Sequence, residues 1–213
     1  MKISRAKWNT ALEYTPRKGQ QAMLDAIDAG HRYISLFAFP RAGKSWGAAR
    51  AVEPYLLQPD THCWIVSPTY ELGSKEFGYI WNDMLKLGFL QMASSRHFDK
   101  RGGNMTIEWP WGSFVKVVSA DNPMSLRAEE LDALILAEAS ALSQDIFYQH
   151  LFARVEKRKG RVLIPTTPKG FNWIYETFRV PSLKVGHKDL HGQGNPRYDP
   201  AFWSAVVSSV PEY

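Results

Sequence analysis

The sequence predicts an α/β fold in which helices flank a mainly parallel, twisted sheet, giving three layers. Short apolar runs alternate with segments of helical periodicity along the 213 residues, and this alternation is typical of parallel sheets covered on both faces. Hydrophobic residues make up 45% of the chain and charged residues 22%, a composition that supports a sizeable core and excludes wholesale disorder. We expect one core domain over residues 1–178, followed by a lid subdomain or linker over residues 179–213.

Each expected element follows from its local pattern. Helices are expected where apolar residues recur at helical spacing, over residues 19–29, 44–57, 70–87 and 171–178. Strands are expected in apolar runs that are too short for surface helices, over residues 31–39, 61–67, 131–136 and 161–165. Two alternating runs within residues 105–119 flank a Pro-Trp-Gly-Ser turn and predict a β-hairpin. The tail after residue 179 is richer in Gly, Pro and His and ends without a helix terminator, so we expect the natural chain to continue.

Composition also excludes several classes of protein. No apolar run approaches the ~18–20 residues that a membrane-spanning helix needs, and the first residues lack the apolar stretch of a signal peptide. A single cysteine, Cys63, excludes an internal disulfide framework. We therefore expect a soluble, intracellular protein. The net charge of +5 and the isoelectric point near 9.3 permit a polyanionic partner without requiring one.

The most informative segment is AFPRAGKS, residues 38–45, between a predicted strand and a predicted helix. A phosphate-binding loop has the pattern G-x-x-x-x-G-K-[ST] in this context; here Ala38 replaces the first glycine. Gly43 would allow the tight turn, Lys44 would reach the β- and γ-phosphates, and the Ser45 hydroxyl would bind Mg²⁺. The pattern predicts a P-loop NTPase, the alternative being an ordinary strand-to-helix turn. The candidate nucleotide-binding residues here are Pro40, Arg41, Ala42, Gly43, Lys44, Ser45 and Trp46.

A second segment supplies the acidic half of such a site. The apolar strand that ends at Leu136 is followed by Ala137 and Glu138, and the carboxyl ends of parallel strands meet at one edge of a sheet. Glu138 is placed to orient or deprotonate the water that attacks the γ-phosphate, the alternative being a solvated carboxylate. Ala137 occupies the position where an aspartate usually helps to hold the Mg²⁺.

Five segments in chain order resemble the ATPase domain of the large subunit of tailed-phage terminases, the motors that package DNA into procapsids. They are Tyr14-x-Pro16 with Gln20, FPRAGKS at 39–45, WIVSPTYELGSKEFG at 64–78, SLRAEELDALILAEAS at 125–140 and IPTTPKGFNWIYETF at 164–178. The resemblance implies adenine recognition by Tyr14 and Gln20, and a coupling motif at Thr166, Thr167 and Pro168. It also implies charge stabilisation by Arg41 in the same subunit and by Arg127 in a neighbouring subunit.

From this resemblance we expect an enzyme, an ATP hydrolase that drives double-stranded DNA into procapsids, with ATP and Mg²⁺ as cofactors. The implied partners are double-stranded DNA, the terminase small subunit and the portal protein, with no membrane. The chain would assemble as a homo-oligomeric ring; for the isolated chain, a monomer is the alternative. It would act in the host cytoplasm as a virus-encoded protein. Only Asp189, Asp199 and Glu212 follow residue 178 as acidic residues, so we expect the family's nuclease domain to be absent from this chain.

Two questions stay open at this level. Ala137 is either an engineered change that impairs hydrolysis, or a natural variant in which Asp121 or Asp132 supplies the carboxylate. The alternatives to a packaging motor are a helicase-like nucleic-acid ATPase and a nucleotide-binding assembly module with impaired hydrolysis.

Overall fold

The computed structural model describes residues 3–38, 40–121, 126, 129–167, 169–170 and 172–179, together with the backbone of residues 203–207. The α-helices are α1 (Arg5–Ala11), α2 (Lys18–Asp28), α3 (Lys44–Leu56), α4 (Tyr70–Lys86) and α5 (Phe152–Lys157). Three further helical segments are the 3₁₀ helix η2 (Ala139–Ala141) and the π-helical η3 (Ile146–Leu151) and η4 (Tyr175–Arg179). The strands are β1 (Tyr33–Phe37), β2 (His62–Ser67), β3 (Ser95–Asp99), β4 (Asn104–Glu108), β5 (Phe114–Ser119), β6 (Ala133–Leu136), β7 (Arg161–Thr166) and β8 (Trp203–Val207).

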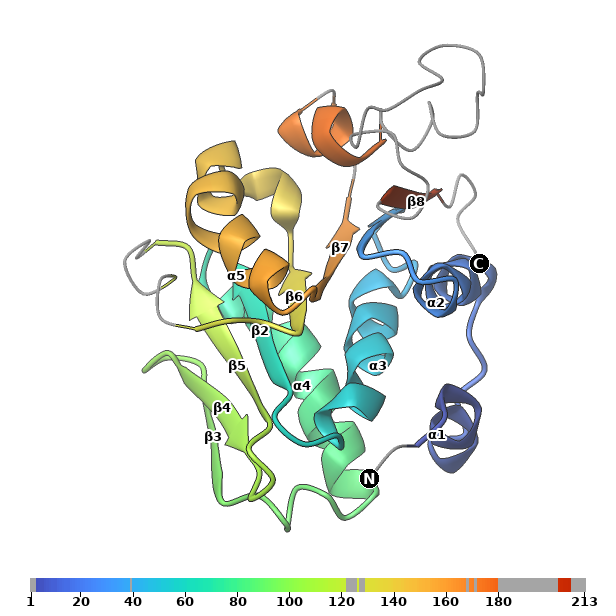
Figure 1. Cartoon of the computed structure of the whole chain (residues 1–213), viewed down its shortest axis with the longest axis vertical. Coiled ribbons are helices and arrows are strands. Elements are labelled where there is room, and N and C mark those ends of the chain that lie inside the picture. The colour runs from blue at the N-terminus through green and yellow to red at the C-terminus, as the bar shows by residue number, and fades with distance from the viewer. Residues whose placement is uncertain are drawn as a thin grey trace.

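One eight-stranded sheet in the described part of the chain organises the molecule, in the order β3-β4-β5-β2-β6-β7-β1-β8 (Figure 1). The strands from β5 to β8 pair in parallel, whereas β3, β4 and β5 pair antiparallel. Strand β7 lies between β1 and β6, so all three end at the same edge of the sheet. This architecture confirms the predicted mainly parallel sheet between layers of helices.

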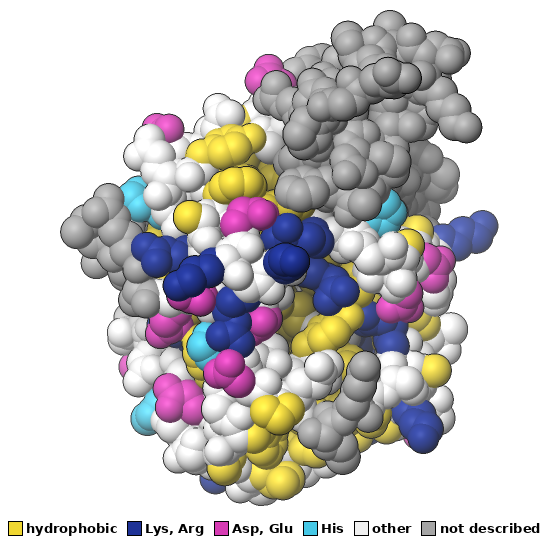
Figure 2. All heavy atoms as spheres, in the orientation of Figure 1, with side chains coloured by type: hydrophobic (Ala, Val, Ile, Leu, Met, Phe, Trp, Pro, Cys, Tyr) yellow, Lys and Arg dark blue, Asp and Glu magenta, His cyan; other side chains and the backbone are white. Residues whose placement is uncertain are grey.

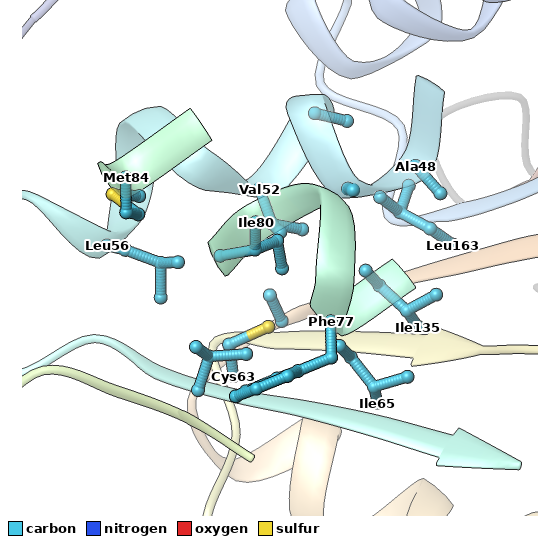
Figure 3. Packing of buried hydrophobic residues seen from close by; sticks show 14 of the residues in the cluster. Ala48, Val52, Leu56, Cys63, Ile65, Phe77, Ile80, Met84, Ile135 and Leu163 are labelled. Carbon is cyan, nitrogen blue, oxygen red and sulfur yellow. The ribbon is translucent and has the colours of Figure 1, made fainter. Parts of the chain in front are cut away.

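Helices cover both faces of the sheet because the central strands bury side chains on both sides. Along β6 the side chains alternate: Ala133 and Ile135 belong to one apolar cluster, Leu134 and Leu136 to the other. Helices α2, α3 and α4 contribute to the first cluster, and η3, α5 and η4 to the second. Figure 3 shows the first cluster, where Val52 of α3 and Phe77 and Ile80 of α4 lie over the strand residues Cys63, Ile65 and Ile135.

The structure adds elements that the sequence patterns did not predict. Helix α1 was not expected; its N-cap is Ser4, whose hydroxyl accepts a hydrogen bond from the Lys7 amide, and it buries Trp8 completely. Strand β3 has a polar, largely exposed sequence. The segment from Ile146 to Lys157 is helical.

Strand β8 bears on the expected boundary at residue 178. We expected residues 179–213 to form a lid subdomain or linker, and residues 203–207 instead pair in parallel with β1 as an edge strand of the core sheet. The other residues after 179 lie outside the described part of the chain, so the division into core and lid stays a prediction. Among the described residues, no helix has the length and apolar character that crossing a membrane would require.

Candidate functional site

The phosphate loop lies at the carboxyl edge of the sheet, between β1 and α3, as its sequence predicts. Gly43 caps α3 with a left-handed backbone at φ 76°, and Arg41 is also left-handed at φ 68°. Alternating left- and right-handed residues turn successive backbone N–H groups toward one point, which is the geometry of an anion-binding concavity. The N-terminus of the 13-residue helix α3 adds its partial positive charge to this point.

Gln20 of α2 fixes the shape of this loop. Its side-chain nitrogen donates a hydrogen bond to the Gly43 carbonyl at 2.8 Å, and its side-chain oxygen accepts one from the Arg17 amide at 2.9 Å. The side chain is only 1% exposed and does not line the cavity at this edge of the sheet. Gln20, expected to contact adenine, is thus placed where it supports the phosphate loop from behind.

Lys44, the first residue of α3, lies at the floor of the site. Its Nζ donates a hydrogen bond to the Ala38 carbonyl at 2.8 Å, and the residue is 9% exposed. Burial lowers the pKa of Lys44, while the nearby carboxylates of Glu138 and Glu76 oppose that shift. Lys44 therefore lies under the loop, where the phosphates of a nucleotide would offer its ammonium group charged acceptors.

Glu138 follows β6 at the same edge, and its backbone is left-handed at φ 50° and ψ 40°. This conformation costs about 1 kcal/mol or more for a residue with a side chain, and such strain is concentrated at functional sites. The turn interrupts the strand alternation, and the Glu138 side chain lines a cavity together with Lys44. Lys44 and Glu138 therefore meet as the sequence predicts.

The cavity at this edge has a volume of about 550 Å³. It is lined by Pro40, Arg41, Gly43, Lys44, Ser45, Trp46, Lys75, Tyr79, Glu138, Thr167 and Lys169. Four of these side chains are cationic and one is a carboxylate. Arg41, Lys75 and Lys169 form no salt bridge with a described residue. The charge of the cavity thus complements a polyphosphate.

Three lining residues were missed by sequence reasoning: Lys75 and Tyr79 of α4, and Lys169 after β7. Lys75 and Tyr79 are four residues apart and at least partly exposed, so they share one helix face. That spacing was visible in the sequence, but nothing in it showed that this face borders the phosphate loop.

Glu76 of α4 is a fourth residue that the sequence analysis missed. It is 2% exposed, and a hydrogen bond joins its carboxylate to the Ser45 side chain. Its Oε2 atom has no hydrogen-bond partner within the described part of the chain. Burial raises the pKa of Glu76, and the Ser45 hydrogen bond partly offsets that rise. The signal available in the sequence was a glutamate on the apolar face of α4, four residues before the buried Ile80.

The residues present fit a magnesium ion at Ser45. Mg²⁺ in nucleotide sites is held by one or two carboxylates, a hydroxyl and substrate phosphates. Ser45 offers the hydroxyl, and Glu76 offers a buried carboxylate oxygen, Oε2, that has no hydrogen-bond partner among the described residues. Ala137 is completely buried and offers neither charge nor acceptor in its side chain.

Neither carboxylate named in the second alternative for Ala137 is in position. Asp132 lies at the opposite, amino end of β6, where its side chain pairs with Arg158 and accepts a hydrogen bond from the His62 amide. Asp121 follows β5, two strands away from β6, and is exposed and absent from the cavity lining. The structure therefore does not favour that alternative, because strand polarity separates Asp132 from the loop and sheet order separates Asp121.

Tyr14, which we expect to contact adenine, packs against another aromatic side chain near the rim of the cavity. Tyr14 is buried, packs against Trp46 with ring centroids 5.0 Å apart, and lies under the Arg50 guanidinium at 4.3 Å. Burial raises the pKa of Tyr14 to about 12. Trp46 and the partly exposed Tyr79 line the cavity, with ring centroids 6.4 Å apart. Tyr14 therefore supports Trp46 from below.

Strand β7 connects the two halves of the site. The Thr166 carbonyl accepts a hydrogen bond from the Ala38 amide, and its hydroxyl accepts one from the Ser140 amide just after Glu138. Thr167 lines the cavity. Pro168 and Arg127 lie outside the described residues.

A smaller cavity of about 240 Å³ lies at the opposite, amino edge, bordered by Asp132, Arg158 and Arg161. Near this cavity Arg158 pairs with Asp60 and Asp132, and Lys157 pairs with Glu130. Figure 2 shows Lys and Arg side chains interspersed with Asp and Glu near the middle of one face. Carboxylates thus offset part of the positive charge at this edge, although Lys159 and Arg161, which also border the cavity, form no salt bridge with a described residue.

Comparisons with known proteins agree with this geometry. The sequence matches no model of a known protein family. It is 30% identical over 192 residues to the terminase large subunit of Escherichia phage T5, a match covering 87% of this chain and 42% of that protein. The fold resembles the large terminase ATPase domain of Thermus phage P74-26, with a TM-score of 0.74 and 24% identity over 97% of this chain and 86% of that one.

A third similar protein is the large terminase of another thermophilic bacteriophage, solved in complex with ADP. Its TM-score is 0.50 and its identity 14%, over 78% of this chain and 42% of that one. The chain thus spans less than half the length of the T5 terminase that it matches. Together the phosphate loop, the opposing glutamate and these similarities make the chain a homologue of phage terminase large subunits, with the fold of their ATPase domain.

Proposed function

We propose that this chain is the ATP-hydrolysing motor part of a terminase large subunit, which couples hydrolysis to the movement of double-stranded DNA into procapsids. The observation that carries the proposal is the cationic cavity in which the phosphate loop faces Glu138. The T5 similarity supports the assignment to a packaging motor rather than to a helicase-like ATPase.

In the proposed reaction, Lys44 and the loop N–H groups bind the β- and γ-phosphates. Arg41, Lys75 and Lys169 add positive charge around the nucleotide, and Glu138 orients the attacking water or accepts its proton. Mg²⁺ held near Ser45 would neutralise charge on the phosphate oxygens. The base would lie toward Trp46 and Tyr79, which line the same cavity.

Thr166 gives the proposed coupling a physical route. It hydrogen-bonds both the start of the phosphate loop and the turn after Glu138, so a shift of either reaches β7. Thr167 and Pro168 would carry such a shift toward the lid, and Arg127 of a neighbouring copy would complete the site. We further propose that the chain acts in the host cytoplasm as a ring of copies. Its partners there would be double-stranded DNA, the terminase small subunit and the portal protein.

The test compares nucleotide binding with hydrolysis in the 213-residue chain. Because Glu138 acts on water and not on ground-state phosphates, Glu138→Gln is expected to lower the rate of ATP hydrolysis at least about 100-fold. The affinity for a fluorescent ATP analogue should stay close to that of the wild type. Equal loss of affinity and rate would contradict the role given to Glu138. A wild-type chain that binds ATP but never turns it over would favour the assembly module.

A further inference from the structure

The absence of a carboxylate at position 137 leaves the phosphate loop without the acidic side chain that usually faces its serine. Ala137 is completely buried and belongs to the apolar cluster on the α3 and α4 face of the sheet. Because the Ala137 side chain has no oxygen, a carboxylate for the space beside Ser45 would have to come from another element.

Glu76 of α4 reaches that space. Helix α4 comes unusually close to the sheet one turn earlier, because Gly73 has no side chain: a Cβ there would lie 2.5 Å from the Ser67 hydroxyl and 2.7 Å from Val117. Helices α3 and α4 also pack against each other. The Glu76 carboxylate consequently lies against the first turn of α3, where it hydrogen-bonds the Ser45 side chain.

The immediate surroundings of Glu76 are those of a site and not of a structural ion pair. The side chain is 2% exposed, yet its Oε2 lacks a partner within the described part of the chain. It forms no salt bridge with a described residue; Lys44, Lys75 and Glu138 are the charged groups near enough to influence it. A buried carboxylate oxygen that lacks a hydrogen-bond partner is costly for the fold, and a cation bound at that oxygen would offset the cost.

Resting on the proposed function, we propose that Glu76 supplies the carboxylate for the magnesium ion of the nucleotide, in place of the residue at position 137. Glu76 would act beside Ser45, either on the ion or on a water bound to it, and would fix the ion relative to the γ-phosphate. Lys44 and Glu138 keep their own roles.

The test measures metal affinity separately from turnover. Manganese(II) serves as the probe, titrated by electron paramagnetic resonance into the chain saturated with ADP. Glu76→Gln is expected to weaken Mn²⁺ binding about 10–100-fold, the usual cost of losing such a ligand partner. Glu76→Asp keeps the charge with a shorter reach and should lie between Gln and wild type. The matched control is Glu71→Gln, an exposed glutamate in the first turn of the same helix.

A carboxylate introduced at position 137 tests whether the loss of Mn²⁺ affinity in Glu76→Gln can be reversed. Ala137→Asp alone should change Mn²⁺ affinity by less than about threefold, because Glu76 already fills the role. In the Glu76→Gln background, the same change should recover most of the loss. A purely structural role for Glu76 would not give rescue by a carboxylate from a different strand.

Two results would overturn the inference. One is an unchanged Mn²⁺ affinity in Glu76→Gln. The other is an increase in Mn²⁺ affinity of about tenfold or more from Ala137→Asp alone, which is the size of effect that a missing ligand partner causes. The second also decides the matter if Glu76→Gln does not fold. Failure of the wild-type chain to bind ADP at all would instead contradict the proposed function. ADP binding with normal Mn²⁺ affinity in Glu76→Gln would leave the function standing and remove Glu76 from it.

Discussion

The two edges of the parallel sheet differ in how their charged side chains are paired. At the amino edge, Arg158 and Lys157 pair with Asp60, Asp132 and Glu130, and the hydrogen bonds from these cations lower the pKa of Asp60 and Glu130. At the carboxyl edge, several cations face a cavity of about 550 Å³ and burial raises the pKa of Glu76.

This difference separates stability from function along one sheet. The paired charges at the amino edge attract one another, so they contribute to the stability of the folded state. At the carboxyl edge, Arg41, Lys75 and Lys169 form no salt bridge with a described residue, which leaves them available for a ligand. Mutations at the two edges should therefore affect different measurements.

The largest expected effect is that of Lys44→Ala on nucleotide binding. Losing charged hydrogen bonds worth about 3 kcal/mol weakens binding about 100-fold or more. Lys157→Ala at the amino edge is the control and should leave affinity unchanged. Titration of both variants with a fluorescent ADP analogue checks this, and similar affinities in the two would remove the distinction between the edges.

Smaller effects are expected when one cation is removed from each edge and both nucleotide affinity and stability are measured. Lys75→Ala should weaken nucleotide binding about fivefold, less at high salt, because an exposed charge contributes about 1 kcal/mol. Arg158→Ala should leave affinity alone and lower the free energy of unfolding by about 1 kcal/mol, or Tm by about 3 °C. Calorimetry and nucleotide titration of both variants should give this crossed pattern. A loss of affinity in Arg158→Ala would mean that the amino edge also serves the nucleotide.

The smallest expected effect is on the pH dependence of stability. The pKa of Asp60 is lowered below its ordinary 3.8, chiefly by the hydrogen bond from Arg158. The folded state then binds fewer protons than the unfolded state, so the stabilisation is present above pH 3.8 and is lost as pH falls through the folded pKa. Asp60→Asn should flatten the fall in urea stability below about pH 4, on the reference carboxyl scale, while binding at neutral pH stays constant. An unchanged acid slope would show that Asp60 makes no net contribution.

Features that depend on local sequence pattern could be predicted from the sequence, whereas features that depend on tertiary packing could not. The meeting of Lys44 and Glu138 was predictable, because parallel strands bring their carboxyl ends to one edge. Helix α1 and strand β3 lacked a clear local pattern, and β8 depends on pairing with β1.

The site shows the same division. Gln20 and Tyr14 were selected by a motif, but the packing of α2 and Arg50 decides that they support the loop and Trp46. Glu76 could not be assigned from sequence, since its position depends on how closely α4 approaches the sheet at Gly73. Strand polarity, which the pattern did contain, was enough to have excluded Asp132.

The contact between α2 and the phosphate loop also limits how these positions can change over evolution. A Cβ at Gly43 would lie 2.6 Å from the Gln20 amide nitrogen, and one at Gly47 would lie 3.0 Å from Gln20 Cγ. Positions 20, 43 and 47 therefore form one steric unit, although they belong to different segments of the sequence. A side chain gained at 47 would push the Gln20 side chain aside, and that side chain holds the Gly43 carbonyl. Substitutions at these three positions should therefore depend on one another, so that the effect of a change at one is set by the residues at the other two.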